Sequence, residues 1–106
     1  MFELLRWVFA HFPSRPEARN AVLRSVFARE GYGLEVIERV RAQTKGTIRL
    51  HGGNVHTILR DLEREGLLMS WERAPKGGRP RRYYKITETG IAAISLRSDA
   101  GRPLPR

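Results

Sequence analysis

The hydrophobic period of the chain changes from helical to extended at Gly66, and this change limits the folds that the chain can adopt. Before it, apolar side chains recur at steps of three and four residues through residues 53–65, which is typical of an amphipathic helix. After it, residues 68–73 and 81–87 flank a Pro-Lys-Gly-Gly turn and predict a β-hairpin. The chain therefore has to combine helices with a small hairpin.

Two more helices are predicted before this point, in residues 17–29 and from residue 33 to just before Lys45-Gly46. The apolar stripe of residues 17–29 consists of Val22, Leu23, Val26 and Phe27. The stripe of the helix that begins at residue 33 consists of Leu34, Ile37 and Val40, and that of residues 53–65 consists of Val55, Ile58, Leu59 and Leu62. Residues 47–50 are expected to form a short strand, and Thr87 is expected to cap a last helix over residues 88–97. The layout predicts a mainly α fold with a small β-hairpin, a winged helix-turn-helix.

An added N-terminal helix over residues 2–12, ended by Pro13, is apolar on two sides. It therefore needs two surfaces to cover it, one on its own domain and one on a partner subunit. The residues expected at such a homodimer interface are Leu4, Leu5, Trp7, Val8, His11, Ile91 and Ile94. The predicted organisation is residues 1–16 as the N-terminal helix, 17–98 as the winged helix-turn-helix domain and 99–106 as a flexible tail.

Composition excludes several classes of function. The 106 residues include no cysteine, which removes disulfide frameworks and thiolate chemistry, and the absence of a signal pattern or a long apolar run favours the cytoplasm over a membrane. The histidines His11, His51 and His56 lack metal-ligand spacing with a carboxylate, and no phosphate-binding loop is present. We expect no enzyme activity, no metal and no cofactor.

Positive charge is concentrated in the predicted hairpin. The chain has 20 Lys and Arg against 11 Asp and Glu, a net charge of +9, and residues 71–86 hold six bases and one acid, so they contribute +5. A surface that was basic only for solubility would not concentrate its charge in this way. Nucleic acid is therefore an expected partner.

Two groups of side chains fit a nucleic-acid interface. Opposite the apolar stripe of residues 53–65 lie types that suit a major-groove reader, Gly53, Asn54, His56, Thr57, Arg60 and Arg64. The hairpin carries cations that suit phosphates, Arg73, Lys76, Arg79, Arg81 and Arg82. The alternative for the helix is an ordinary solvated face, with Arg60 and Arg64 paired to Asp61 and Glu63. The alternative for the hairpin is a soluble, mobile turn.

Three stretches resemble the PadR family of transcriptional regulators. They are Gly31-Tyr32-Gly33-Leu34, Leu62-Glu63-Arg64-Glu65-Gly66-Leu67, and Gly78-Arg79-Pro80-Arg81-Arg82-Tyr83-Tyr84-Lys85-Ile86-Thr87-Glu88 with Gly90, within a resemblance that covers residues 18–94. The resemblance implies a homodimeric, winged-helix DNA-binding repressor that is often relieved by a small molecule. Where the family has Ser-Pro-Gly-Thr-Leu-Tyr, this chain has His51-Gly52-Gly53-Asn54-Val55-His56.

The function predicted from these observations is a sequence-specific transcriptional regulator that binds a palindromic double-stranded operator as a homodimer and acts as a repressor. Two alternatives stay open. The basic surface could bind an acidic protein in a protein-interaction module, or Trp7 and Trp71 could line an aromatic ligand pocket. Sequence-preferring, salt-dependent binding to duplex DNA separates the first alternative from a DNA-binding regulator.

Overall fold

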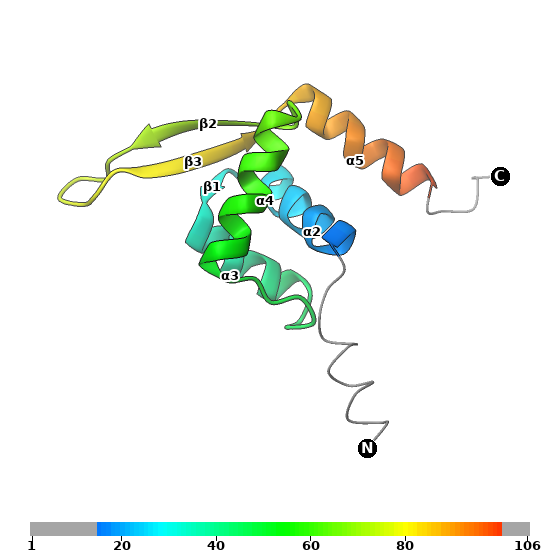
Figure 1. Cartoon of the computed structure of the whole chain (residues 1–106), viewed down its shortest axis with the longest axis horizontal. Coiled ribbons are helices and arrows are strands. Elements are labelled where there is room, and N and C mark those ends of the chain that lie inside the picture. The colour runs from blue at the N-terminus through cyan, green and yellow to red at the C-terminus, as the bar shows by residue number, and fades with distance from the viewer. Residues whose placement is uncertain (1–14, 101–106) are drawn as a thin grey trace, which may run out of the picture.

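The fold combines a group of helices with a hairpin that projects from it. A computed structural model of the chain describes residues 15–100, with side chains as far as residue 95. The elements are α2 (Arg15–Ala28), β1 (Gly31–Tyr32), α3 (Gly33–Gln43), α4 (Gly52–Arg64), β2 (Leu68–Arg73), β3 (Arg81–Ile86) and α5 (Glu88–Ala100). In Figure 1, α2, α3 and α4 lie together, while the β2–β3 hairpin extends to one side and α5 to the other. The predicted mainly α winged-helix fold is confirmed.

The N-terminal part of the prediction lies outside the described residues. This applies to the added N-terminal helix and to its expected interface residues, which are Leu4, Leu5, Trp7, Val8 and His11. At the other end, α5 continues to Ala100, so Asp99 and Ala100 are helical although the sequence placed them in the tail.

One hydrophobic core joins α2, α3 and α4 to the inner face of the sheet. Helix α4 buries the predicted stripe, with Val55 and Leu59 fully buried, Leu62 at 1% exposure and Ile58 packed against them. The other buried members of the core are Ala18, Ala21, Val22, Leu23, Val26, Val36, Val40, Leu50, Leu68 and Tyr84. Helix α4 is therefore fixed on one side and open on the other.

Two residues assigned to apolar stripes are exposed instead. Phe27 is 51% exposed and Leu34 is 58% exposed, so the predicted stripes of α2 and α3 were wrong at these positions. Helix α2 turns Ala18, Val22 and Ser25 toward the core, a face that leaves Phe27 outside. Small residues on the buried face allow the helices to approach closely. The sequence prediction relied on large apolar residues and therefore missed this face.

The predicted strand at residues 47–50 is wrong, because this segment is a loop held by Thr44. The Thr44 hydroxyl donates a hydrogen bond to the Val40 carbonyl at 2.7 Å and accepts one from the Ile48 N–H at 3.1 Å. Lys45 (φ 52°) and Gly46 (φ 79°) adopt left-handed conformations that end α3 and prevent an extended run.

The third strand is β1, which was not predicted from the sequence. In the described part of the chain the sheet has the order β1-β3-β2 and is antiparallel. The register pairs Gly31 with Tyr84 and Trp71 with Tyr83. Because side chains alternate along a strand, Tyr84 faces the core at 5% exposure while Tyr83 lies on the outer face.

A junction made of Gly66, Leu67, Thr87 and Gly90 connects α4, the hairpin and α5. The predicted cap is confirmed, since the Thr87 hydroxyl accepts a hydrogen bond from the Gly90 N–H at 3.0 Å and donates one to the Gly66 carbonyl at 2.6 Å. The Thr87 N–H donates to the Leu67 carbonyl at 3.0 Å. Gly66 has a φ of +81°, which reverses the chain after α4.

We expect Gly90→Ala to destabilise the fold by about 1–3 kcal/mol, the usual cost of overpacking. A methyl group at Gly90 would collide with the Leu67 carbonyl oxygen and would come within 2.6 Å of the Ile86 Cγ1 atom. Gly52→Ala is the matched control, because nothing lies within 4 Å of the added methyl group there. Thermal and urea unfolding followed by circular dichroism measure both variants. Equal stability of the two would show that α5 does not press on the junction.

Candidate nucleic-acid interface

The open side of α4 presents the polar residues that the sequence predicted there. Gly53, His56, Thr57, Arg60 and Arg64 are all exposed. A shallow cavity of about 200 Å³ on this side is lined by His56, Thr57, Arg60, Asp61 and Arg64. Because the opposite side of the helix is buried in the core, these side chains stand on a rigid support.

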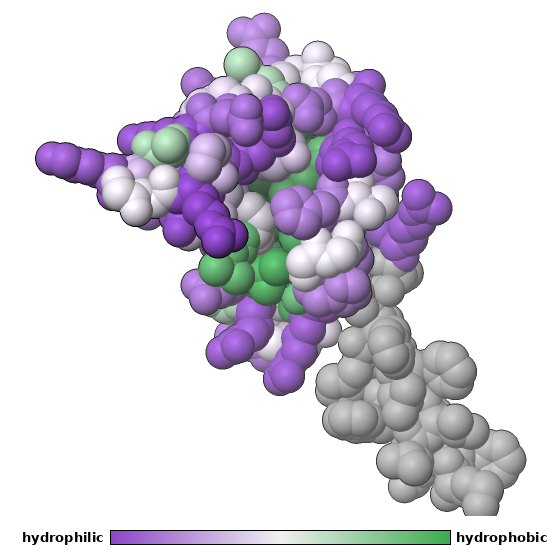
Figure 2. Space-filling view, turned by 60° about the vertical axis from the view of Figure 1, so that its left-hand side comes forward, coloured by the Kyte–Doolittle hydropathy of each residue, from purple (hydrophilic) through white to green (hydrophobic). Residues whose placement is uncertain are grey.

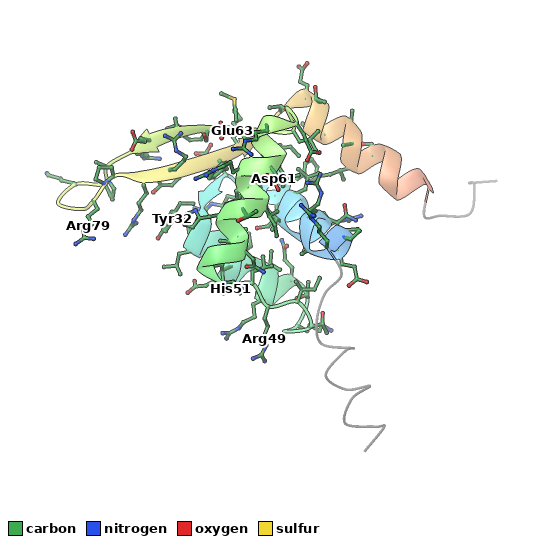
Figure 3. All side chains as sticks on the ribbon, viewed as in Figure 1. Tyr32, Arg49, His51, Asp61, Glu63 and Arg79 are labelled. Atoms are coloured by element: carbon green, nitrogen blue, oxygen red, sulfur yellow. The ribbon has the colours of Figure 1, made fainter. Side chains whose placement is uncertain are left out.

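The start of α4 is capped by a histidine. The His51 Nδ1 atom accepts a hydrogen bond from the Asn54 N–H at 3.4 Å, and the Asn54 Oδ1 atom accepts one from the His51 N–H at 2.8 Å. Figure 3 shows His51 at this end of the helix. This reciprocal pair takes the place of a serine cap. It also uses one lone pair of the Asn54 carbonyl oxygen, while the side-chain NH2 group of Asn54 keeps both its donors for another contact.

A second opening lies between the first turns of α2 and α4. It is a cavity of about 460 Å³ lined by Arg15, Ala18, Arg49, His51, Asn54, Thr57 and Ile58. Arg49 extends outward from the loop before α4, as Figure 3 shows. The sequence analysis did not include Arg49 or Arg15 in the interface. An arginine two residues before the cap of a candidate reading helix was the signal that could have identified Arg49.

The predicted hairpin cations are brought together around one turn. Arg73 ends β2, Arg81 and Arg82 begin β3, and the intervening turn carries the other two, Lys76 and Arg79. All five are exposed. The turn is closed by a hydrogen bond from the Gly78 N–H to the Pro75 carbonyl at 2.8 Å. Arg79 lies at the hairpin tip in Figure 3, and hydrophilic side chains cover most of the projecting hairpin in Figure 2.

Arg82 differs from the other hairpin cations because it is hydrogen-bonded within the protein. Its Nη1 atom donates to the Ser70 hydroxyl at 2.9 Å, and Ser70 in turn donates to the Glu63 carboxylate at 2.6 Å. These three residues belong to β3, β2 and α4. The chain of hydrogen bonds therefore links the hairpin directly to the helix whose open side carries the polar residues.

Ion pairing leaves most of the interface cations available. The alternative of a solvated face predicted that Arg60 and Arg64 pair with Asp61 and Glu63. Arg64 approaches Asp61 only at 3.9 Å, and Arg60 forms no ion pair among the described residues. Glu63 is engaged by Ser70 instead.

The strongest ion pair lies outside the interface and fixes the end of α4. The Arg19 guanidinium donates two hydrogen bonds to Glu65, at 2.8 and 2.7 Å. These bonds lower the pKa of the Glu65 carboxyl below its ordinary value. Burial raises the pKa of the Tyr84 phenol on the inner face of the sheet, assisted by the charge of Glu63.

The described residues offer no metal site and no membrane span. No group of three or more His, Asp or Glu side chains within residues 15–95 is arranged to hold a metal ion. Over the same part of the chain, no helix combines the length and the apolar composition needed to cross a bilayer.

Comparison with known proteins identifies relatives of this arrangement. Residues 22–96 match the model of the transcriptional regulator PadR-like family. An uncharacterised protein from Lysinibacillus sphaericus is 23% identical over 76 residues, which cover 72% of this chain and 70% of that protein.

Solved structures share the fold. A PadR-family transcriptional regulator from Eggerthella lenta superposes with a TM-score of 0.68 at 22% identity, covering 81% of this chain and 72% of that one. Bacillus subtilis PadR in complex with operator DNA gives a TM-score of 0.72 at 15% identity. That match covers 84% of this chain and 50% of the Bacillus protein, so this chain spans about half of its length.

We expect Glu65→Gln to lower the melting temperature at pH 7, and the deficit to shrink progressively as the pH falls below 4.5. The folded-state pKa of Glu65 lies below its unfolded value, so its contribution to stability is present above pH 4.5 and is lost as the pH falls through the folded pKa. Glu38→Gln, at an exposed position on α3, is the control. Melting curves of the unmodified protein and both variants, measured from pH 7 down to the lowest pH at which the chain folds, test this dependence. A deficit that stays constant as the pH falls would assign the effect to something other than the Glu65 charge.

Proposed function

The chain belongs to the PadR-like family of transcriptional regulators, and from this premise we propose that it is a homodimeric repressor that binds double-stranded operator DNA sequence-specifically. In this proposal α4 lies in the major groove and the β2–β3 hairpin contacts the DNA backbone. The relative from Bacillus subtilis was solved with operator DNA, which supports operator DNA as the partner.

The observation that carries the proposal is the placement of unpaired cations on two rigidly connected elements. Arg60 stands on the open side of α4 without an ion pair among the described residues, and Arg79 stands at the hairpin tip. The hydrogen bonds through Ser70 hold these two elements in one relative position. Two connected basic elements fit a surface of regularly spaced phosphates and grooves.

The two elements have different roles in this proposal. Side chains on α4 read base edges, because arginine donates two parallel hydrogen bonds to guanine and Thr57 suits a base edge or a phosphate. Asn54 contributes through its two amide donors, which its hydrogen bonds with His51 leave unused. The hairpin cations contact phosphates and supply affinity that depends little on sequence. The residues assigned to α4 are Gly53, Asn54, His56, Thr57, Arg60 and Arg64, and those assigned to the hairpin are Arg73, Lys76, Arg79, Arg81 and Arg82.

Exposed apolar side chains on α2 and α5 support the homodimer. Phe27 is 51% exposed and Ile91 is 41% exposed, and Ile94 is only partly buried. An adjoining cavity of about 520 Å³ is lined by Ala21, Arg24, Phe27, Gln43, Thr44 and Ile94. We propose that a second copy covers this surface, together with the N-terminal residues Leu4, Leu5, Trp7, Val8 and His11. Phe27 is an addition that the sequence analysis assigned to the core.

A two-fold axis would give the dimer a palindromic operator. The two α4 helices would then enter successive major grooves about 34 Å apart. Repression follows if the occupied operator overlaps the start of transcription, and the protein would act in the cytoplasm together with its DNA.

We expect duplex-DNA binding that falls steeply with salt. A dimer that makes about six phosphate contacts should lose roughly a thousandfold in affinity between 50 and 200 mM salt, because each contact releases condensed counterions. Fluorescence anisotropy with the operator and with a scrambled duplex measures this dependence. Affinity that does not change with salt, or equal affinity for both duplexes, would contradict the proposal. An acidic protein as the preferred ligand would favour the protein-interaction alternative.

We expect Arg60→Ala and Arg79→Ala to weaken DNA binding in different ways. Arg60→Ala should cost about 1–3 kcal/mol on the operator and relax the preference for one base pair. Arg79→Ala should weaken binding to operator and random DNA alike and reduce the salt slope by about one. Each variant serves as the control for the other. Equal losses on both duplexes for Arg60→Ala would place that residue on a phosphate.

We expect Ile91→Asp to convert the dimer to a monomer, because it places a charge on the proposed apolar interface. Met69→Asp is the control, since Met69 is 51% exposed, lies on β2 and does not line the adjoining cavity. Deletion of residues 1–12 should also weaken the dimer. Light scattering at low micromolar concentration measures the mass of all three variants. A dimeric Ile91→Asp protein would exclude α5 from the interface.

A further inference from the structure

The outer face of the sheet carries a row of three aromatic side chains, one from each strand. The register places Tyr83 of β3 opposite both Tyr32 of β1 and Trp71 of β2. The Tyr32 and Tyr83 rings meet edge to face with centroids 5.4 Å apart, and Trp71 stacks beside Tyr83 at 6.1 Å. The three side chains are half-buried, so each ring lies against the sheet and is not free in solvent.

Two register positions toward the hairpin tip, on the same face of the sheet, two arginines face each other. Arg73 and Arg81 are paired across β2 and β3, an arrangement in which like charges repel. Each guanidinium lies over a ring of the aromatic row instead. The Arg81 Cζ atom is 4.5 Å from the Tyr32 ring centroid, and the Arg73 Cζ atom is 5.5 Å from the Tyr83 ring centroid. The electron-rich ring faces attract both cations and hold them apart.

Within residues 15–95, no acidic side chain pairs with the guanidinium groups of Arg73 and Arg81 and so competes with the aromatic rings for them. In this described part of the chain, neither guanidinium donates a hydrogen bond to another group or forms an ion pair, in contrast to Arg82, Arg19 and Arg64. Contact with a ring face uses the flat side of a guanidinium and leaves its N–H edge open. Arg73 and Arg81 are therefore ordered cations whose donors remain available.

We propose that Tyr32 is a positioning residue for DNA binding, which holds Arg81 in the orientation that contacts a backbone phosphate. This inference rests on the proposed function. Arginine loses considerable rotamer freedom when it binds a phosphate, and a side chain already held against a ring has lost part of that freedom beforehand. Tyr32 belongs to β1 beside α3, so it also ties the base of the hairpin to the body of the domain. Tyr83 serves Arg73 in the same way.

A double-mutant cycle tests the role of Tyr32. Tyr32→Leu removes the ring and keeps an apolar side chain, and it should weaken operator binding about two- to fivefold, the range expected for an exposed cation–aromatic contact. In the Arg81→Ala background the same substitution should have no further effect. Tyr32→Phe, which keeps the ring, should restore binding. Melting temperatures of all variants identify those that fail to fold.

Nuclear magnetic resonance of the full chain without DNA supplies a second readout. The Arg81 Nε–H should be as rigid as the backbone, and the Arg81 δ-methylene protons should be shifted upfield by the Tyr32 ring. Both signatures should persist in Tyr32→Phe and disappear in Tyr32→Leu. Nuclear relaxation of the Arg81 side chain reports this motion directly.

The outcomes separate this inference from the proposed function. Equal losses for Tyr32→Leu in the presence and absence of the Arg81 guanidinium would overturn the positioning role and assign Tyr32 to packing. A mobile Arg81 would overturn it whether or not the protein binds DNA. An ordered Arg81 in a protein that binds no duplex would overturn the proposed function, and with it the DNA-binding role of the contact.

Discussion

The structure depends on the close approach of α5 to the turn between α4 and β2. Gly90 leaves room for the Leu67 carbonyl, and Thr87 bonds to both sides of the contact, so one site fixes where α4 ends, where the hairpin begins and where α5 leaves. The hydrogen bonds from Arg82 through Ser70 to Glu63 set the hairpin against α4 further along. The relative position of the two basic elements is therefore a property of the backbone junction and of one polar contact.

Much of the fold could be predicted because it depends on local patterns. The stripe of α4, the Thr87 cap and the two strands of the hairpin each have a periodic or capping signature within a few residues. Strand β1 has none, since two residues carry no period and its existence depends on a partner more than 50 positions later. The exposure of Phe27 and Leu34 likewise depends on which helix faces meet, which is a tertiary property.

The candidate site was predictable in its composition and less so in its internal contacts. Exposure of the α4 and hairpin cations follows from the apolar stripe and from the turn. The use of Asn54 in a cap with His51, and of Arg82 in a bond to Ser70, requires knowledge of cap geometry and cross-strand register. The Arg39 guanidinium donates hydrogen bonds to the Ser25 carbonyl in the last turn of α2, at 3.0 Å, and to the Arg29 carbonyl just after that helix, at 2.6 Å. These bonds join α2 and α3, which were predicted from the sequence as separate helices.

Because β1 has only two residues, different parts of the sheet are protected from amide hydrogen exchange to different extents. Within the described residues, three strands pair only at Tyr83 and Tyr84. From Arg82 toward the tip, the hairpin is a two-stranded ribbon, which is marginally stable alone in water. Amide hydrogens near Leu68 and Ile86 should exchange only in global unfolding, whereas those near Arg73 and Arg81 should exchange through local opening. The hairpin tip beyond Arg73 and Arg81 can thus adjust to an irregular polyanion, while the base of the hairpin is held against α4 by the Ser70 hydrogen bonds and the core stays ordered.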